Sequence, residues 1–360
     1  MDKTVIVVGT RPEIIKMAPV IREFQERKKD FTFILSGQHY DYALSKQLLE
    51  DLSLPSPQAA FKLNNANPAS QIGEMMTKLE TNLTKEEPAL LLIQGDTNTM
   101  LAAGLTAVKL KIPLGHVEAG LRSYDWRMPE EHNRRMVDHI SDLLFTPTEQ
   151  AKKNLLKEHV HGRVYVTGNT VMDAVLQHLP IAQRKSKIID QVKFDEYALF
   201  TIHRAENVDD AEVLKSLVKV LVNFPIPTIF PLHPRTKKRL QQYHLQHKLA
   251  HSKNIQLLPP LGYLDTLRLM KECKLIATDS GGLQEEATAP SIRKTVIVLR
   301  TSTERPEAVK AGFATVVGLN HQDILRASRH LLENPPSLPK TSPFGDGKAA
   351  QKIIRILLSQ

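Results

Sequence analysis

The chain has 360 residues, of which 41% are hydrophobic and 24% charged, and its formal net charge is +9. These values are typical of a soluble globular protein, and the length favours two domains of about 150 residues or more over one core. No stretch approaches the roughly 18 consecutive apolar residues that a membrane span requires. The single cysteine, Cys273, excludes an intrachain disulfide and a cysteine-based zinc site, so a cytoplasmic location is expected.

Positive charge is concentrated in the second half of the chain, where no acidic residue occurs between Glu212 and Asp265. One interpretation is a solvated helix face, and another is a basic wall that attracts an anionic substrate. A nucleic-acid partner is not expected, because aromatic residues make up only 5% of the chain and no RNP, KH or zinc-finger signature is present.

Short β-rich runs alternate with amphipathic stretches along the whole chain. In the first half, strands are predicted at Thr4–Val8, Thr32–Leu35, Leu90–Gln94, Pro113–Val117, Leu143–Thr146 and Val164–Thr167. In the second half, they are predicted at Ala198–Ile202, Thr228–Pro231, Ile255–Leu258, Leu275–Thr278, Thr295–Leu299 and Thr315–Val317. Helices are predicted between them, for example at Thr97–Leu110, Val213–Asn223 and Tyr263–Cys273. Apolar strands separated by helices indicate parallel sheets covered on both faces.

This α/β pattern of a doubly wound sheet occurs twice, which predicts two Rossmann-like domains with a cleft between them. We expect an N-terminal domain at 1–169, a C-terminal domain at 170–345, and a last helix within 346–360 that crosses back to the first domain. Ligands of open parallel sheets bind outside the carboxyl ends of the strands. Polar residues in the loops that follow strands are therefore the first candidates for chemistry.

The loop after the first predicted strand begins at Gly9 and carries two cations, Arg11 and Lys16. Gly9 permits a tight turn, Pro12 suits the first turn of a helix, and the free N–H groups there attract phosphate. The alternative is an ordinary strand-to-helix turn. The G-x-G-x-x-G pattern of dinucleotide-binding folds is absent, which argues against NAD.

Three further loops of the first half bring carboxylates, namely Asp96, Glu118 and Glu130, with Arg122 and Arg134 near enough in sequence to orient or neutralise them. Acids crowded in one cleft raise one another's pKa, which suits proton transfer near neutral pH. Structural ion pairing is the alternative, and an isolated Asp96 would more simply cap the next helix.

The second half carries histidine and arginine after two predicted strands, at His203 with Arg204 and at His233 with Arg235. Such pairs suit contacts with phosphate or a leaving group, and a buried structural histidine is the alternative. After the strand ending at Thr278 comes a segment that offers N–H groups for phosphate and a carboxylate for ribose; its candidate residues are Ser280, Gly281, Gly282 and Glu286. No Ser-His-Asp order, Walker A lysine or metal-ligand spacing occurs, so no metal is expected.

Eight motifs follow one another from residue 9 to residue 308: GTRPEIIK, QGDTNT, HVEAGLRS, MPEEHNR, TIHRAEN, HPRTKKR, DSGGLQEEA and TERPEA. In this order they resemble the non-hydrolysing UDP-N-acetylglucosamine 2-epimerases, and the archaeal-like branch looks closest. PFGDGKA near the C-terminus resembles that family's tail. The resemblance implies a glycosyltransferase-B-like fold, a homodimer, no cofactor, and interconversion of UDP-N-acetylglucosamine with UDP-N-acetylmannosamine through elimination and re-addition of UDP.

The resemblance also implies roles for single residues. The expected catalytic residues are Asp96, Glu118, Glu130 and His203, the last beside the pyrophosphate. The expected substrate and UDP contacts are Arg11, Lys16, Arg134, His233, Arg235, Ser280, Gly281, Gly282 and Glu286. A hydrolysing epimerase, a UDP-sugar-dependent glycosyltransferase and a sugar-nucleotide-binding protein are the alternatives. Carboxylates on three loops favour elimination chemistry over the last two.

Overall fold

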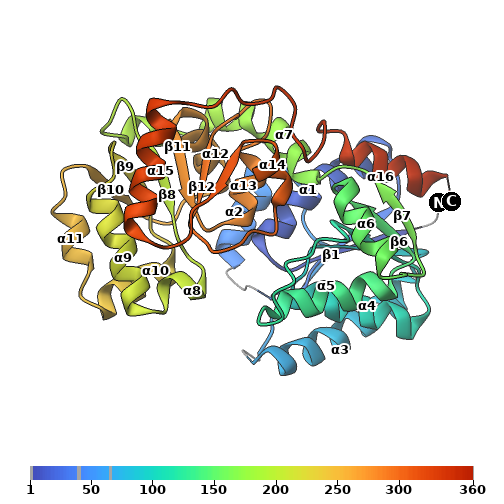
Figure 1. The fold of residues 1–360 in the computed structure, drawn as a ribbon. Helices are drawn as coiled ribbons and strands as arrows, with labels where there is room; N and C mark the ends of the chain where they lie inside the picture. Colours follow the sequence, from blue (N-terminus) through green and yellow to red (C-terminus); the bar gives the residue numbers. More distant parts are fainter. Residues whose placement is uncertain (1–2, 39–41, 65–66, 360) are drawn as a thin grey trace. The chain divides into compact units, whose positions relative to one another are not determined.

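The structure, a computed structural model, describes residues 3–38, 42–64 and 67–359. The chain divides into two compact units, one formed by Met1–Ala174 with Phe344–Gln360 and the other by Val175–Pro343. Each unit contains one wholly parallel sheet with helices on its faces (Figure 1). The predicted α/β class of two doubly wound Rossmann-like domains is thus confirmed. No helix within the described ranges is both long and apolar enough to cross a membrane.

The sheet of the first unit has seven strands in the order β3-β2-β1-β4-β5-β6-β7. Their bounds are β1 Thr4–Val8, β2 Phe31–Leu35, β3 Ala59–Ala60, β4 Leu90–Gln94, β5 Leu114–Val117, β6 Leu143–Thr146 and β7 Arg163–Val166. The central strand β1 is buried along its whole length, because its apolar side chains face helices on both sides of the sheet. The short edge strand β3 was not predicted; it pairs with β2 through two residues only.

Helices connect these strands and cover the sheet. They are α1 Arg11–Glu26, α2 Tyr42–Asp51, α3 Pro68–Glu86, α4 Asn98–Leu110, α5 Pro129–Ile140, α6 Glu149–Lys157 and α7 Thr170–Lys185, the last of which carries the chain into the second unit. One face of the sheet packs on α3 and α4 in a core that includes Leu79, Leu83 and Met100. This apolar core fixes the strand ends from which the polar loops project.

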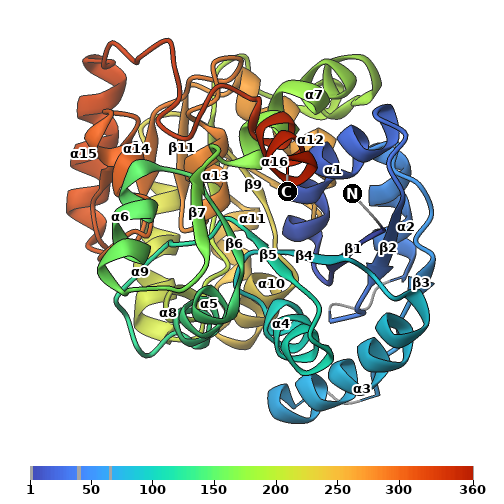
Figure 2. The same cartoon turned by 90° about the vertical axis from the view of Figure 1, so that its right-hand side faces the viewer.

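The C-terminal helix α16, Ala349–Leu358, packs against α1 (Figures 1 and 2). Its apolar side, which includes Ile353, Ile354 and Leu357, is buried. The first N–H groups of the helix donate to the carboxylate of Asp173, at 3.1 Å from Ala349 and 3.0 Å from Ala350. Burial raises the pKa of Asp173 to about 6 against the opposing effect of these hydrogen bonds.

The sheet of the second unit has six strands in the order β10-β9-β8-β11-β12-β13. Their bounds are β8 Ala198–Thr201, β9 Thr228–Pro231, β10 Ile255–Leu258, β11 Leu275–Thr278, β12 Val296–Val298 and β13 Ala314–Val316. The helices are a 3-10 turn at Ile188–Gln191, then α8 Ala205–Val208, α9 Ala211–Val222, α10 Pro234–Gln242, α11 Gln246–Ala250, α12 Tyr263–Glu272, α13 Gly281–Glu286, α14 Pro306–Lys310 and α15 His321–Glu333. Three phenylalanines, Phe200, Phe224 and Phe230, pack edge to face in the core.

Candidate active site

The strand order reverses at one point in each sheet, between β1 and β4 in the first and between β8 and β11 in the second. Open parallel sheets leave a crevice at such a point, outside the carboxyl ends of the strands. The loops that begin at Gly9 and Gly95 lie at the first point, and those that begin at Ile202 and Asp279 lie at the second. Most of the candidate residues follow these four strands or the adjacent strand β5.

The turn between β1 and α1 is closed by a capping box formed by Thr10 and Glu13. The Glu13 carboxylate accepts hydrogen bonds from the backbone N–H groups of Gly9 and Thr10 and from the Thr97 hydroxyl. Glu13 therefore joins the first loop to the loop that follows β4. Burial raises the pKa of Glu13 to about 7, although these hydrogen bonds favour its ionised form. Arg11, the first residue of α1, is half-buried in the same turn.

The residue Asp96 is held in place through its neighbours in the chain. The Gly95 carbonyl lies 2.9 Å from His116 Nε2, and the Asp96 carbonyl accepts from Asn133 Nδ2 at 3.0 Å. The Asp96 carboxylate forms an ion pair with Arg134, whose side chain is 6% exposed. Asp96 itself is only partly buried, with 32% of its side chain exposed. A partly open carboxylate on a fixed backbone is suited to reach a bound substrate.

The carboxylate of Glu118 is more enclosed, with 7% of its side chain exposed. It forms an ion pair with Lys16 of α1 and accepts from Asn169 Nδ2 at 3.1 Å. The backbone of Glu118 has φ of +71°, in the left-handed region that a residue with a side chain seldom adopts. Such backbone strain is concentrated at functional sites. Lys16, expected among the nucleotide contacts, is thus found beside a candidate catalytic carboxylate.

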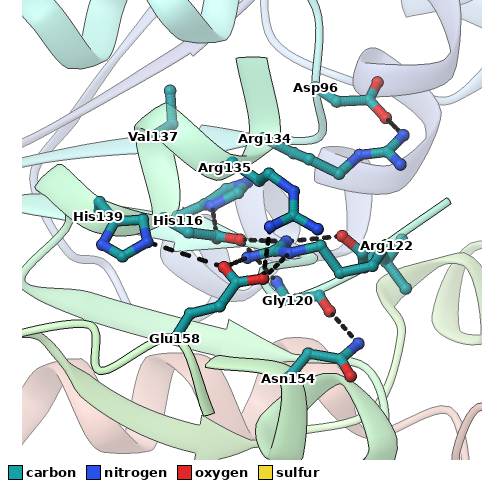
Figure 3. A network of polar contacts seen from close by, with 12 residues as sticks. Asp96, His116, Gly120, Arg122, Arg134, Arg135, Val137, His139, Asn154 and Glu158 are labelled. Carbon is teal, nitrogen blue, oxygen red and sulfur yellow. Dashed lines mark hydrogen bonds and ion pairs between the residues drawn. The ribbon is translucent and has the colours of Figure 1, made fainter. Parts of the chain in front are cut away.

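A buried network of ion pairs supports these two loops from the side of α5 (Figure 3). The carboxylate of Asp138 lies 2.8 Å from His116 Nδ1 and 2.7 Å from Arg122 Nη1. The Arg122 guanidinium also forms an ion pair with the Glu158 carboxylate at 2.7 Å, and Arg135 donates to the same carboxylate at 2.8 Å. Arg122 therefore orients Asp138 and Glu158 rather than Asp96, Glu118 or Glu130.

The two adjacent glutamates at the start of α5 have different environments. Glu131 is fully buried and accepts from Arg134 at 2.8 Å and from Arg135 at 3.0 Å. Burial opposes ionisation of Glu131, but hydrogen bonds from Ser123 and the two arginines outweigh it and hold the pKa of Glu131 below its ordinary value. Glu130 is half-buried, and its side chain makes no hydrogen bond or ion pair with the residues that the structure describes. Its carboxylate is therefore available to a ligand, whereas Glu131 fixes Arg134.

In the second unit, His203 and Asp279 form a pair at the ends of β8 and β11. His203 Nδ1 lies 2.9 Å from Asp279 Oδ1, and the other carboxylate oxygen accepts from the N–H groups of His203 and Arg204, both at 2.9 Å. Asp279 is fully buried; burial opposes its ionisation, but the contacts with His203 outweigh it and lower the pKa of Asp279. Because Nδ1 faces the Asp279 carboxylate, Nε2 on the other side of the ring is directed away from the pair.

In the segment after β11, the hydroxyl of Ser280 caps α13. Gly281 is buried and Gly282 half-buried, and a methyl group built on Gly281 would lie 3.8 Å from the Arg305 guanidinium. Glu286, 8% exposed, ends the helix beside the buried hydroxyl of Tyr263. The pKa of Tyr263 is raised well above its ordinary value, by burial first and then by Glu286.

Buried charges surround α13. Arg305 forms an ion pair with Glu285, and Arg300 forms one with Glu304 at 2.7 Å. Burial opposes ionisation of Glu304, but Arg300 and Arg305 outweigh it and lower its pKa to about 2. None of these four residues was a candidate from the sequence, although two belong to the TERPEA motif and one to DSGGLQEEA.

The second histidine–arginine pair has a different environment from the first. The His233 ring lies 5.4 Å from the His203 ring, and its Nδ1 accepts from the Arg235 N–H at 3.2 Å. The Arg235 guanidinium forms an ion pair with Asp209, which Arg239 also contacts at 2.9 Å. These two arginines lower the pKa of Asp209 to about 2. His233 therefore lies beside His203, whereas the described contact of Arg235 is with an acid outside the candidate set.

Several residues that position the candidates were not predicted from the sequence: Glu13, Asn133, His116, Asp138 and Asn169 within the first unit, and Asp209 and Tyr263 within the second. For Glu13 a signal was available, because Thr10-Arg-Pro-Glu13 has the spacing of a capping box. Asn169 and Asp138 have no such signal, since their partners lie 51 and 22 residues away. Among the described residues, no group of three or more histidine, cysteine, aspartate or glutamate side chains could hold a metal ion.

The chain is similar to known proteins of one family. The family model described as UDP-N-acetylglucosamine 2-epimerase matches residues 22–358. UDP-N-acetylglucosamine 2-epimerase of Methanocaldococcus jannaschii is 44% identical over 99% of this chain and 98% of its own. The crystal structure of an enzyme of that name from the same organism, in complex with UDP-GlcNAc and UDP, is 43% identical, covers both chains completely and has a TM-score of 0.92. UDP-2,3-diacetamido-2,3-dideoxy-D-glucuronate 2-epimerase of Pseudomonas aeruginosa is 34% identical over 99% of both chains.

Proposed function

Because the chain belongs to the UDP-N-acetylglucosamine 2-epimerase family and is an isomerase, we propose that it interconverts UDP-N-acetylglucosamine and UDP-N-acetylmannosamine. The two sugars differ only in configuration at C2. This carbon bears an acetamido group and has no carbonyl beside it, so its hydrogen is not acidic enough for simple deprotonation and return. A non-hydrolysing route must weaken the C2–H bond by another means.

Elimination of UDP provides this means. A base removes the proton from C2 while the bond between C1 and the UDP oxygen breaks, which leaves 2-acetamidoglucal and UDP. In the return step an acid adds a proton to the opposite face of C2, and the UDP oxygen bonds to C1 again. The two steps balance without an external oxidant or reductant, and UDP must stay bound between them.

One observation carries this proposal: Asp96 and Glu118 follow adjacent parallel strands, and each forms an ion pair with a buried cation. Two carboxylates at one sheet edge supply the acid and base that opposite faces of C2 require. Glu130, half-buried at the start of α5, is proposed as the third group of the set. Arg134 and Lys16 orient the first two carboxylates and offer positive charge to the substrate.

The second unit is proposed to hold UDP. His203, fixed by Asp279 with Nε2 directed away from the pair, is proposed to stabilise charge on the departing pyrophosphate, with His233 beside it. The segment Ser280–Gly282 is proposed to contact phosphate through its N–H groups, together with Arg11 and Arg235, and Glu286 to accept from ribose hydroxyls. We thus propose that the carboxylates of an N-terminal domain, 1–169, act on a sugar whose UDP is held by a C-terminal domain, 170–345.

Substrate identity and assembly are part of the same proposal. The Pseudomonas aeruginosa relative has a substrate with a second acetamido group at C3, but its identity of 34% is lower than the 44% of the Methanocaldococcus jannaschii enzyme. This difference supports UDP-N-acetylglucosamine as the substrate. We further propose a homodimer that acts in the cytoplasm without an added cofactor, and light scattering on the purified chain tests the dimer.

A time course of proton NMR spectra tests the function. Desalted, EDTA-treated protein is mixed with UDP-N-acetylglucosamine, and the anomeric signals of both UDP-sugars and of free sugar are followed. The proposal predicts growth of UDP-N-acetylmannosamine to a constant ratio. Accumulation of free N-acetylmannosamine with UDP would identify a hydrolysing enzyme, and an unchanged spectrum would refute the proposal. A parallel sample with the 2,3-diacetamido substrate tests the choice between the two sugars.

A further inference from the structure

The ring of His116 connects the two loops that carry Asp96 and Glu118. The side chains of His116 and Asp138 are completely buried. On one side, His116 Nε2 lies 2.9 Å from the carbonyl of Gly95, the residue before Asp96. On the other, Nδ1 lies 2.8 Å from Asp138, whose second oxygen accepts from the Gly120 N–H at 3.2 Å. Figure 3 shows His116 and Arg122 in the same buried network.

Both ring nitrogens of His116 face groups that accept hydrogen bonds. The Gly95 carbonyl can only accept, and an ionised Asp138 can only accept as well. A neutral imidazole has one N–H group, so it can satisfy one of the two, whereas an imidazolium satisfies both. Two contacts independent of His116 favour the ionised form of Asp138 against the effect of burial: its second oxygen pairs with Arg122 at 2.7 Å and accepts from the Gly120 N–H at 3.2 Å.

The charge of the surrounding ion-pair network also favours a protonated His116 ring. Four carboxylates belong to this network, Asp96, Glu131, Asp138 and Glu158, and the three arginines that pair with them are Arg122, Arg134 and Arg135. His139 also faces Glu158, at 3.7 Å, but its side chain is 46% exposed. Among the more buried groups, a protonated His116 makes the fourth cation and balances the four carboxylates. A neutral His116 would leave an excess negative charge among buried groups, which is costly in a medium of low dielectric constant.

We propose that His116 is a buried imidazolium, held by Asp138, and that this pair is a positioning device that sets Asp96 and Glu118 relative to each other. The pair binds the backbone one residue before Asp96 and two residues after Glu118, so a shift of either loop breaks one of its hydrogen bonds. The inference rests on the proposed acid and base roles of the two carboxylates. His116 does not act on the substrate in this account; it acts through the backbone.

The protonation state is tested first, because it needs no activity. Protein labelled with nitrogen-15 in histidine is studied by two-dimensional NMR at neutral pH, and the His116 signals are assigned by their loss in His116→Gln. Two protonated ring nitrogens are expected in the unsubstituted protein. In Asp138→Asn the amide can donate to Nδ1, so a neutral ring with a proton on Nε2 alone is expected. A neutral ring in the unsubstituted protein would overturn the inference.

The positioning role is tested by turnover. Misplacement of catalytic groups by about 1 Å costs on the order of 100-fold, so Asp138→Asn is expected to lower kcat by about 10- to 100-fold and to leave UDP affinity unchanged. Glu158→Gln is the matched control, because it removes a charge from the same network at a side chain that contacts Arg122 and Arg135 but not the backbone of either loop, and its kcat is expected to stay within about threefold. Equal losses in both variants would show a general structural effect and contradict the proposal.

Two substitutions of His116 separate the contacts of its two ring nitrogens. They replace the turnover test if Asp138→Asn does not fold. The amide nitrogen of His116→Gln can replace Nε2 and still donate to Gly95, whereas that of His116→Asn can replace Nδ1 and donate only toward Asp138. The proposal expects the first to keep more activity than the second. The reverse order would overturn it. Inactive unsubstituted protein would instead refute the proposed function, while the NMR result would stand.

Discussion

The substitution Glu13→Gln is expected to stabilise the protein at high pH and to have no effect at low pH. Glu13 is 3% exposed, and its pKa in the folded protein is about 7 compared with an ordinary value of 4.5. Between these two values the folded state keeps a proton that the unfolded state has released, so stability is lost as pH rises through this window. At 1.36 kcal/mol per pKa unit, the full cost above pH 7 is about 3 kcal/mol.

A glutamine removes this cost and keeps the shape of the side chain. Its carbonyl oxygen can accept from Gly9 and Thr10, and its amide can donate to Thr97 after the hydroxyl rotates. The gain of about 3 kcal/mol corresponds to a rise of roughly 6–12 °C in Tm for a protein unit of this size. At pH 4.5, where Glu13 is protonated in the folded protein, we expect the variant and the parent to have equal Tm values.

Calorimetry of the parent and Glu13→Gln at pH 4.5 and pH 8.5 measures this difference. The control is Glu26→Gln, an exposed position on the same helix, which should change stability by less than about 0.5 kcal/mol at either pH. A gain in Tm for Glu13→Gln that is the same at both pH values would contradict a raised pKa of Glu13, because it could not arise from the titration of a buried carboxyl.

The remaining predictions concern catalysis and binding. Asp96→Asn and Glu118→Gln should each lower turnover by about 100-fold or more, as expected for general acid or base groups. Both variants should bind UDP nearly normally in calorimetric titrations. Loss of UDP affinity with turnover preserved at saturation would reverse the roles of the two units. Glu286→Gln should weaken UDP binding by about 1.5–3 kcal/mol, because a charged acceptor is lost. Tyr263→Phe removes only the hydroxyl beside Glu286, so equal weakening in that variant would show that the effect is structural.

Much of the fold could be predicted from the sequence, because buried parallel strands are continuous apolar runs between helices. Leu90–Gln94 and Leu275–Thr278 were predicted with the bounds that the structure has. The edge strand Ala59–Ala60 was not predicted, since two alanines give no pattern and their pairing with β2 depends on tertiary structure. Periodicity reports burial on a strand or helix, and it carries little information about short edges.

The candidate site could be predicted only in part. Loops after adjacent strands indicated Asp96 and Glu118, because the chain position of a residue after a strand determines the sheet edge at which it lies. The sequence does not predict in the same way which side chains pair with each other. The pair between Lys16 and Glu118 was not predicted, and Arg122 was expected at the candidate acids and is found at Asp138. Which buried cation meets which acid depends on packing between elements distant in sequence.

The most direct test of the central claim is the fate of the hydrogen at C2 when the reaction is run in D2O. Elimination and re-addition require that C2 lose its proton and receive one from an enzyme group that exchanges with solvent. UDP-N-acetylmannosamine formed in D2O should therefore carry deuterium at C2, seen in proton NMR as loss of the H2 signal and of its coupling to H1. Product that retains the original hydrogen at C2 would exclude elimination and re-addition.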